Sequence, residues 1–581
     1  MLLLQATDQG TTTLRTAGDY EADKQAAIAN SKAKKFEEWP NEAGFDGLSE
    51  QRGPFELPVG GSIPTYAIGS LYRTGPGGCK VEGTKSGTFH ISHWFDGLAH
   101  THRFDIVADP SDPAKTRVLY SSRRQSDDLI RDIQSSSKFR AVSFGQLRDP
   151  CTGLFGKFMS VFDRGGRLDN IAVTVQANIP GLQECAKKNA TSNGTNGVQG
   201  HRAIPGTVFL GTDTAWLSQI DPKGMQPLGF FHHRKLHTTL KGPMGPAHAM
   251  VDPATGDYFS FNLDFSLAFH GIYRIFKVNA ATGKTTILAT VKQAAAYIHS
   301  FFLTPSYVVL CIPVSHLDVV KLLWRGNLVE AFKPFDSSKN CKWLVVDRNG
   351  AGLVGELDSP AAFFFHSTNA FEEPNGDVVC EYIEYSNTDV ISSFYYDVLL
   401  HRNNWNQGVW GDRLASGQKY PHLVRRRLRK ADFLGPNSNA GGTLVAALDL
   451  DILGPHAGDL PTINNLYIFR RNRYVFCLLN QGLSTLFDSI AKINTETKEV
   501  LYWSGGFGHS PGEAIFVARP PLEGKDGEPE EDDGVLLSVV LDGIRGTSYL
   551  VCLDAKTMTE TGRAECQFAV GFGFHGLHLK G

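Results

Sequence analysis

Four of the nineteen histidines stand in apolar, mostly aromatic segments whose side chains should be buried. Burying a neutral imidazole costs free energy unless its ring nitrogens find partners. A hydrogen-bonded core residue is the simpler interpretation of any one of them, but imidazole is also the commonest protein ligand for metals. Four such sites together favour a metal centre, formed by His248 (Pro-Ala-His-Ala), His299 (Tyr-Ile-His-Ser), His366 (Phe-Phe-His-Ser) and His575 (Gly-Phe-His-Gly).

The spacing of these histidines indicates which kind of fold could bring them together. They are separated by 51, 67 and 209 residues, and none belongs to a local helical motif such as HExxH. Each ligand would therefore come from a separate set of strands. A β-propeller provides that geometry, because the inner strands of its blades converge on one axis.

The chain that must position the histidines has the pattern of a β protein. From about Gly53 onward, apolar runs of five to eight residues alternate with turn signals such as Asp252-Pro-Ala-Thr-Gly-Asp and Glu373-Pro-Asn-Gly-Asp. This pattern predicts an all-β barrel, sandwich or propeller. The length of 581 residues favours a propeller, although no WD40 or kelch repeat at a fixed period reveals a blade count. Residues 1–53 are polar and partly helical in pattern, so we expect an N-terminal arm followed by one catalytic domain over residues 54–581.

Composition excludes several function classes. The net charge of −3 gives no field for a polyanion, so no nucleic-acid partner is expected. The nine cysteines form no CxxC pair, which predicts reduced thiols in a cytoplasmic protein. There is no signal-peptide pattern and no apolar stretch long enough to span a bilayer. We expect a soluble protein, or one that sits on a membrane surface, with no obligate protein partner evident.

Six motifs, in order along the chain, carry a family resemblance. The motifs are His93-Trp-Phe-Asp-Gly, Phe144-Gly-Gln-Leu-Arg-Asp-Pro-Cys, Gly211-Thr-Asp-Thr-Ala-Trp, Phe365-His-Ser-Thr-Asn, Ser510-Pro-Gly-Glu and Phe574-His-Gly-Leu. With these motifs in this order, the sequence resembles, over residues 54–581, the carotenoid cleavage oxygenases, and within them the fungal carotenoid and torulene dioxygenases.

The resemblance implies a fold and an iron site. The fold would be a seven-bladed β-propeller with helical and loop insertions forming a cap over the iron centre. His248, His299, His366 and His575 match the family's four Fe(II) ligands. The resemblance also places Asp213, Asp459 and Glu513 where the family has glutamates that orient these rings, and Phe95 and Thr212 near the iron and an apolar substrate tunnel. Phe95 and Thr212 could equally be packing residues.

Two of the three carboxylates depart from the family pattern. Asp213 and Asp459 are one methylene shorter than glutamate. A hydrogen bond from either aspartate to its histidine would need a closer backbone or a bridging water.

The resemblance further implies the reaction. With O2 as co-substrate, an Fe(II) enzyme of this kind would cleave a C=C bond of a carotenoid or apocarotenoid, such as a torulene-like polyene, to carbonyl products. Stilbene cleavage is an alternative, although Arg124 stands where stilbene-cleaving members have a tyrosine. A polyene isomerase or a non-catalytic carotenoid-binding protein are further alternatives.

An apolar substrate suggests contact with lipid. Residues 154–162 and 317–332 resemble membrane-facing regions of the family, and Cys151 resembles a cysteine proposed there as an acyl-lipid site. In residues 317–332 the apolar side chains recur at roughly helical spacing, with Lys321 and Arg325 able to snorkel. The alternative is an amphipathic helix packed on the propeller. Peripheral membrane association of a cytoplasmic enzyme is therefore the expectation.

Overall fold

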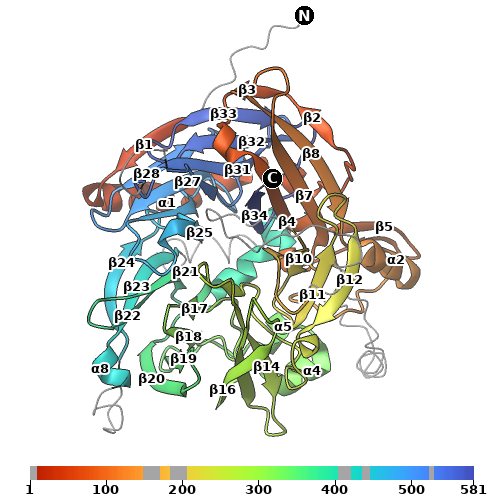
Figure 1. The fold of residues 1–581 in the computed structure, drawn as a ribbon. Helices are drawn as coiled ribbons and strands as arrows, with labels where there is room; N and C mark the ends of the chain where they lie inside the picture. Colours follow the sequence, from red (N-terminus) through yellow and green to blue (C-terminus); the bar gives the residue numbers. More distant parts are fainter. Residues whose placement is uncertain are drawn as a thin grey trace, which may run out of the picture.

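Seven antiparallel sheets surround one central axis in the computed structural model (Figure 1), which describes residues 10–147, 170–182, 206–402, 420–434, 445–521 and 529–580. The expected seven-bladed β-propeller is thereby confirmed. The first three sheets, in strand order, are β2 (Phe55–Leu57), β8 (Thr116–Arg124), β7 (Leu98–Ala108), β4 (Gly69–Gly78) and β34 (His575–Lys580); β12 (Pro227–His232), β11 (Trp216–Ile220), β10 (Val208–Gly211) and β9 (Thr174–Ala177); and β13 (Met250–Val251), β14 (Tyr258–Phe265), β15 (Gly271–Val278) and β16 (Thr285–Gln293).

The remaining four sheets continue around the ring. The fourth and fifth sheets are β17 (Phe302–Leu303), β18 (Tyr307–Ile312), β19 (Asn340–Asp347) and β20 (Gly352–Pro360); and β21 (Phe363–Glu372), β22 (Val378–Tyr385), β23 (His422–Leu428) and β24 (Ala447–Leu453). The sixth is β25 (Asp459–Thr462), β26 (Tyr474–Leu479), β27 (Ser489–Asn494), β28 (Val500–Ser504) and β1 (Thr11–Arg15). The seventh is β29 (His509–Pro511), β31 (Gly534–Asp542), β32 (Thr547–Asp554), β33 (Glu560–Glu565) and β3 (Val59–Gly61), and β30 (Ile515–Ala518) also pairs with β31. The strands β5 (Lys80–Thr84) and β6 (Gly87–His90) form a separate hairpin.

The strands follow from the apolar runs and the turns between them. All six residues of β18 are buried, as expected of a continuous apolar run covered on both faces. The expected turn at Asp252-Pro-Ala-Thr-Gly-Asp joins β13 to β14, and Asp252 Oδ1 accepts the Ala254 N–H at 2.8 Å. Gly256 closes this turn at φ +74°, a left-handed conformation that glycine adopts without steric cost. Between neighbouring blades the sheets pack through large side chains such as Trp343, which is fully buried.

The two ends of the chain close the ring. The C-terminal strand β34 pairs with β4 in the first sheet, from His575 opposite Thr74 to Lys580 opposite Gly69. Near the start of the chain, β3 pairs with β33 in the last sheet. Residues on the innermost strand of the first blade therefore come from the last residues of the chain.

The N-terminal segment packs on the propeller rather than extending from it. Strand β1 pairs with β28 as the outer strand of its blade, and α1 (Tyr20–Lys32) lies beside that blade (Figure 1). Beyond α1, the side chains of Phe36, Trp39 and Phe45 are each 3% exposed. The boundary between an arm and a catalytic domain at residues 53 and 54 stays a prediction.

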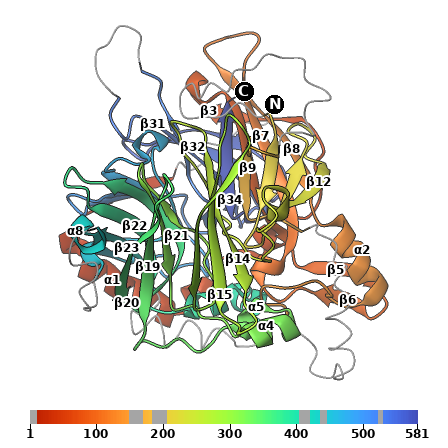
Figure 2. The same ribbon diagram turned by 60° about the horizontal axis from the view of Figure 1, so that its bottom comes forward.

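Helical insertions gather at one end of the propeller, which Figure 2 draws at the bottom. The helices α4 (Val319–Arg325) and α5 (Leu328–Ala331) lie between β18 and β19, and α6 (Tyr396–Leu399) follows the 3₁₀ segment Asp389–Phe394 after β22. The other described α-helices are α2 (Asp127–Ser136) and α8 (Lys430–Phe433). Among the described residues, no helix combines the length and the apolar character needed to cross a bilayer.

Candidate metal centre

The structure brings the four singled-out histidines to one point. Each offers a ring nitrogen, and these four nitrogens all lie within 4.8 Å of one another. His575 is the first residue of β34 and His366 lies in β21, while His248 and His299 come just before β13 and β17. All four strands are the innermost of their blades, so the propeller axis positions the cluster.

Three of the histidines are each held by a carboxylate. The Nδ1 atoms of His299, His366 and His575 lie 2.7 Å from Asp213 Oδ1, Asp459 Oδ1 and Glu513 Oε1, respectively. A carboxylate only accepts hydrogen bonds, so each Nδ1 carries the proton and each Nε2 presents a lone pair. The two aspartates reach their histidines directly, at the same distance as the glutamate. The shorter side chain is therefore compensated by a closer backbone.

The Nε2 atoms converge in a way that suits a shared cation. His575 Nε2 lies 3.1 Å from both His248 Nε2 and His366 Nε2. With the protons of His366 and His575 on Nδ1, the contact between their Nε2 atoms has no hydrogen between its two lone pairs. Two imidazole nitrogens bound to one metal at about 2.1 Å and at right angles would lie about 3.0 Å apart. The donor set thus fits a metal ion with four neutral imidazole ligands.

The environment favours the neutral form of two of the imidazoles, His248 and His575. Burial, reinforced by the neighbouring imidazoles, holds the pKa values of His248 and His575 well below their ordinary value. Neutral imidazole is the form that binds metals.

Each carboxylate is fixed in turn by a further buried group. The hydroxyl of Tyr297 donates to Asp213 at 3.1 Å, and that of Tyr385 donates to Asp459 at 2.6 Å. Arg73 donates to Glu513 Oε2 at 3.0 Å, and the Gly576 N–H donates to the same oxygen at 2.7 Å.

These partners give the carboxylates different acidities. Burial raises the pKa of Glu513 to about 7, against the opposing effects of Arg73 and the Gly576 N–H. Burial acts in the same direction on Asp459, but His366 and Tyr385 outweigh it and bring the pKa of Asp459 below its ordinary value. The charge of a metal ion bound by the histidines would favour the ionised form of both groups.

Sequence reasoning missed Tyr297, Tyr385 and Arg73. Only Tyr297 carries a local signal, because it stands two residues before His299 and an extended chain directs such residues to the same side. Tyr385 is 74 residues from Asp459, and Arg73 is 440 residues from Glu513. Neither pairing has a local pattern.

An aromatic cluster that includes Phe95 adjoins the histidines. The Phe95 ring lies 5.9 Å from that of Phe365 and 5.1 Å from that of Phe574, which precede His366 and His575 in the chain. The rings of Phe144 and Phe394 complete this cluster, at 4.6 and 5.2 Å from Phe95. Thr212 is half-buried and directly precedes Asp213. The expected substrate tunnel stays a prediction.

The His93-Trp-Phe-Asp-Gly motif has a structural role in this cluster. The carboxylate of Asp96 accepts the N–H groups of Phe144 and Gly145 at 2.6 and 2.7 Å. The ring of His93 contacts the carbonyl oxygen of Ile391 at 3.0 Å. The motif thereby holds the segments that carry Phe144 and Phe394 against Phe95.

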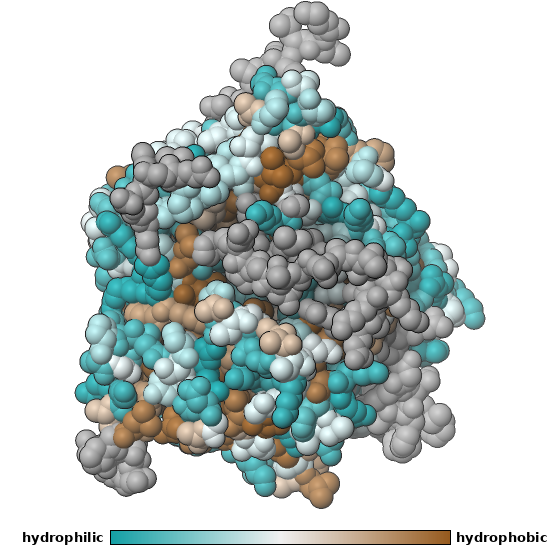
Figure 3. All heavy atoms as spheres, viewed as in Figure 1, coloured by the Kyte–Doolittle hydropathy of each residue, from teal (hydrophilic) through white to brown (hydrophobic). Residues whose placement is uncertain are grey.

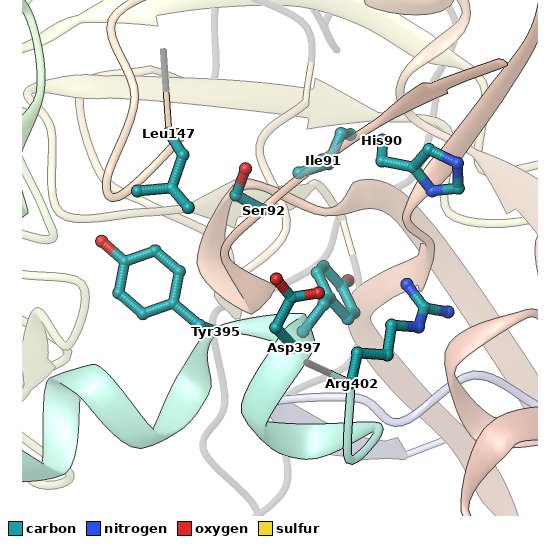
Figure 4. A pocket seen from close by; sticks show the side chains of 8 residues that line it. His90, Ile91, Ser92, Leu147, Tyr395, Asp397 and Arg402 are labelled. Atoms are coloured by element: carbon teal, nitrogen blue, oxygen red, sulfur yellow. The ribbon is translucent and has the colours of Figure 1, made fainter. Parts of the chain in front are cut away.

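A cavity of about 370 Å³ opens between residues 90–92 and the segment that carries α6 (Figure 4). Its lining includes the polar or charged side chains of His90, Ser92, Tyr395, Asp397 and Arg402, and none of the four clustered histidines. Such a lining does not suit a hydrocarbon polyene.

Some sequence expectations fall outside the described residues, namely the segment 154–162 and Cys151. The seven described cysteines are free thiols and all are buried. None of them belongs to the cluster of possible metal ligands.

Comparisons with known proteins agree with this architecture. A family model described as RPE65, retinal pigment epithelial membrane protein, matches residues 44–580. The chain is 43% identical to a carotenoid dioxygenase of Neurospora crassa, covering 98% of this chain and 96% of that protein. It is also 43% identical to a torulene dioxygenase of Gibberella fujikuroi (97% and 98% covered), and 26% identical to a mitochondrial carotenoid-cleaving dioxygenase of Homo sapiens (90% and 87% covered).

Solved structures show the same fold. A cobalt-substituted Synechocystis apocarotenoid oxygenase superposes with a TM-score of 0.67 at 20% identity, over 93% of this chain and 98% of that one. The family model covers nearly the whole chain, and two relatives exceed 40% identity over nearly their full length. The chain therefore belongs to the RPE65 family of carotenoid cleavage oxygenases.

Proposed function

We propose that this protein is an Fe(II)-dependent dioxygenase that cleaves a C=C bond of a carotenoid or apocarotenoid, with a torulene-like polyene as the favoured substrate. The observation that carries the proposal is the convergence of imidazole lone pairs, with His575 Nε2 lying 3.1 Å from two other Nε2 atoms. The relatives named carotenoid dioxygenase and torulene dioxygenase support the substrate class, because each covers at least 97% of this chain.

The residues of the metal centre would have two different roles. His248, His299, His366 and His575 would hold the metal, and Asp213, Asp459 and Glu513 would orient three of those rings through their Nδ1 protons. Bound Fe(II) would activate O2 for reaction with an electron-rich double bond. Because the four histidines would be the only protein ligands, coordination positions on the metal would remain free for O2. The aromatic cluster around Phe95 would exclude water and contact the apolar chain of the substrate.

Product analysis tests this proposal. The Fe(II)-loaded protein is incubated in air with torulene, β-carotene, an apocarotenal or resveratrol, and products are identified by mass. We expect two carbonyl products from a polyene and none from resveratrol. Aldehydes from resveratrol alone would replace the proposal by stilbene cleavage, and a change of double-bond geometry without cleavage would replace it by isomerase chemistry.

We further propose that α4 contacts a lipid surface. Val320, Leu323 and Trp324 are 50%, 39% and 43% exposed and recur at helical spacing, while Val319 at the start of the helix is buried. The guanidinium of Arg325 lies over the Trp324 ring at 5.0 Å, where it can reach phosphate headgroups. The segment 317–332 forms two short helices rather than one, since Gly326 at φ +61° ends α4.

The turn between β14 and β15 is a second exposed apolar element that could contact lipid. At the turn between β14 and β15, Leu267 is fully exposed and Phe269 is 51% exposed. Phe265 of β14 and Leu322 of α4 pack against the same core cluster. Figure 2 draws α4 and α5 at the bottom of the molecule, so Figure 3, which keeps the view of Figure 1, shows the end of the propeller away from them.

A further inference from the structure

The N-terminal segment contacts the rest of the chain at three points. Each point lies three positions before a residue of the metal centre. Those contact points are His456, Ser510 and Phe572, and the residues that follow are Asp459, Glu513 and His575. Together they belong to two of the three histidine–carboxylate pairs.

The first contact is made by α1. Asp23 Oδ2 lies 2.8 Å from His456 Nε2, and the ring of Tyr20 packs edge-on against the same imidazole with ring centroids 5.5 Å apart. His456 is 4% exposed, so this contact is inside the molecule. It anchors the loop that leads into Asp459, the acceptor for His366.

The second contact is a buried hydrogen-bonded chain. Trp39 Nε1 donates to Ser510 Oγ at 2.8 Å, and Ser510 Oγ donates to Asn41 Oδ1 at 2.9 Å. Asn41 Nδ2 then donates to Ser484 Oγ at 3.0 Å in the neighbouring blade. Since these groups are all buried, loss of one donor leaves an acceptor unsatisfied.

The third contact holds the chain that leads into His575. The Phe572 N–H donates to the Gly44 carbonyl oxygen at 2.8 Å, and the rings of Phe45 and Phe572 lie 4.9 Å apart. Gly47 packs so closely on Gly571 that a Cβ at position 47 would lie 2.8 Å from the Gly571 nitrogen. The approach of the two backbones at this point therefore depends on glycine.

We infer that residues 20–47 form a positioning brace for the metal centre, which sets the Asp459–His366 and Glu513–His575 pairs. A ligand ring that is held a few tenths of an ångström away from its place binds the metal less well, and the partners that orient such rings typically contribute ten- to a hundredfold in metal affinity. Residues 20–47 contact the carboxylate-bearing segments rather than the ligand rings, so they should contribute less to metal affinity, about three- to tenfold. The inference rests on the proposed metal site.

Two pairs of full-length variants separate bracing from simple stability. Trp39→Phe and Asn41→Ala remove hydrogen bonds to Ser510. Thr12→Val and Asn30→Ala are the controls, because they remove bonds from the same N-terminal segment to Met558 O (2.7 Å) and Gln481 O (3.0 Å), neither of which adjoins a residue of the metal centre. Trp39→Phe retains an aromatic ring and is the variant expected to fold most readily.

Metal affinity and stability are then measured separately. Fe(II) and Co(II) affinities are obtained by competition with a chelator, the Co(II) absorption spectrum reports the ligand field, and urea unfolding of the metal-free protein reports stability. We expect Trp39→Phe and Asn41→Ala to lose about three- to tenfold in affinity and to change the Co(II) spectrum, while the controls keep both at the wild-type level.

Two results would overturn the inference in distinguishable ways. Wild-type metal affinity and spectrum in both Trp39→Phe and Asn41→Ala, with stability alone reduced, would show that the segment only stabilises the fold. A wild-type protein that binds neither Fe(II) nor Co(II) would instead remove the proposed metal site, and the brace with it.

Discussion

Arg73 and Glu513 form a buried ion pair, with 3.0 Å between Arg73 Nη1 and Glu513 Oε2, directly behind His575. Their side chains are 2% and 7% exposed, so neither charge can be solvated once its partner is lost. The pair fixes one oxygen of Glu513 and leaves the other to orient the imidazole of His575. The other two carboxylates have tyrosine hydroxyls in place of an arginine.

Glu513→Gln should weaken metal binding by about ten- to a hundredfold. The amide can still accept from His575, but it removes the negative charge that makes the ring a stronger ligand and leaves Arg73 unpaired. Chelator competition measures the effect. Glu372→Gln is the matched control, because Glu372 lies at the far end of β21 from His366 and accepts hydrogen bonds from Thr304 and Ser306 rather than from a histidine of the cluster. Equal affinities in the two variants would contradict a role for Glu513.

Asp459→Glu should also weaken metal binding, although it restores the residue type that the family resemblance implies at this position. Asp459 already spans from His366 at 2.7 Å to Tyr385 at 2.6 Å, so an added methylene has to displace one of these partners. We expect Tyr385→Phe in the Asp459→Glu background to recover part of the affinity by vacating space. Wild-type affinity in Asp459→Glu alone would show that the backbone does not impose the shorter side chain.

Asp488 should make stability depend on pH. Burial raises the pKa of Asp488 to about 7, against hydrogen bonds from the Gln481 N–H and the Ser489 hydroxyl. In the unfolded chain the carboxyl ionises near pH 4, so the folded state binds the extra proton between about pH 4 and 7. This contribution to stability is full below pH 4 and is lost as the pH rises to 7, by about 1.4 kcal/mol per pH unit.

Asp488→Asn should remove that slope. Urea unfolding at pH 5, 6, 7 and 8 should show the stability of the variant rising relative to that of the wild type up to about pH 7, with a nearly constant difference above it. Parallel curves for the two proteins across this range would mean that Asp488 is ionised in the folded state.

Trp324→Ser should reduce binding to lipid vesicles without reducing cleavage of a detergent-solubilised substrate. The reason is that Trp324 is 43% exposed on α4 and belongs to none of the groups around the histidines. Co-sedimentation with phosphatidylcholine vesicles measures binding, and Ile544→Ser, an equally conspicuous exposed apolar residue at 65%, serves as the control. Equal loss in both variants would indicate general surface hydrophobicity rather than a docking face.

The features that could be predicted from the sequence are those with a recognisable local sequence pattern. The alternation of apolar runs and turns predicted an all-β fold, and the family resemblance implied seven blades, which the structure confirms. The long separations between His248, His299, His366 and His575 predicted ligands from separate strands, and the four lie together at the axis. Both predictions depend on patterns that can be recognised within a few consecutive residues: the strands and turns, and the apolar segment around each histidine.

What depends on ring closure could not be predicted in this way. Arg73 meets Glu513 only because β34 pairs with β4, which brings together residues 440 positions apart. The polar N-terminal segment gave no sign that Trp39 and Asn41 would be buried against Ser510, because its helical pattern reports only local conformation. The replacement of two glutamates by aspartates was visible, but whether the backbone came closer was a question of tertiary packing.

X-ray absorption at the iron edge of the Fe(II)-loaded protein tests the central claim most directly, because it reports the atoms bound to the metal. One iron per chain with four imidazole nitrogens at about 2.1 Å, falling to at most three in His366→Ala together with a large loss of occupancy, is the predicted result. An iron that retains the wild-type spectrum in His366→Ala, or that is bound by carboxylate oxygens in place of the imidazoles, would contradict it.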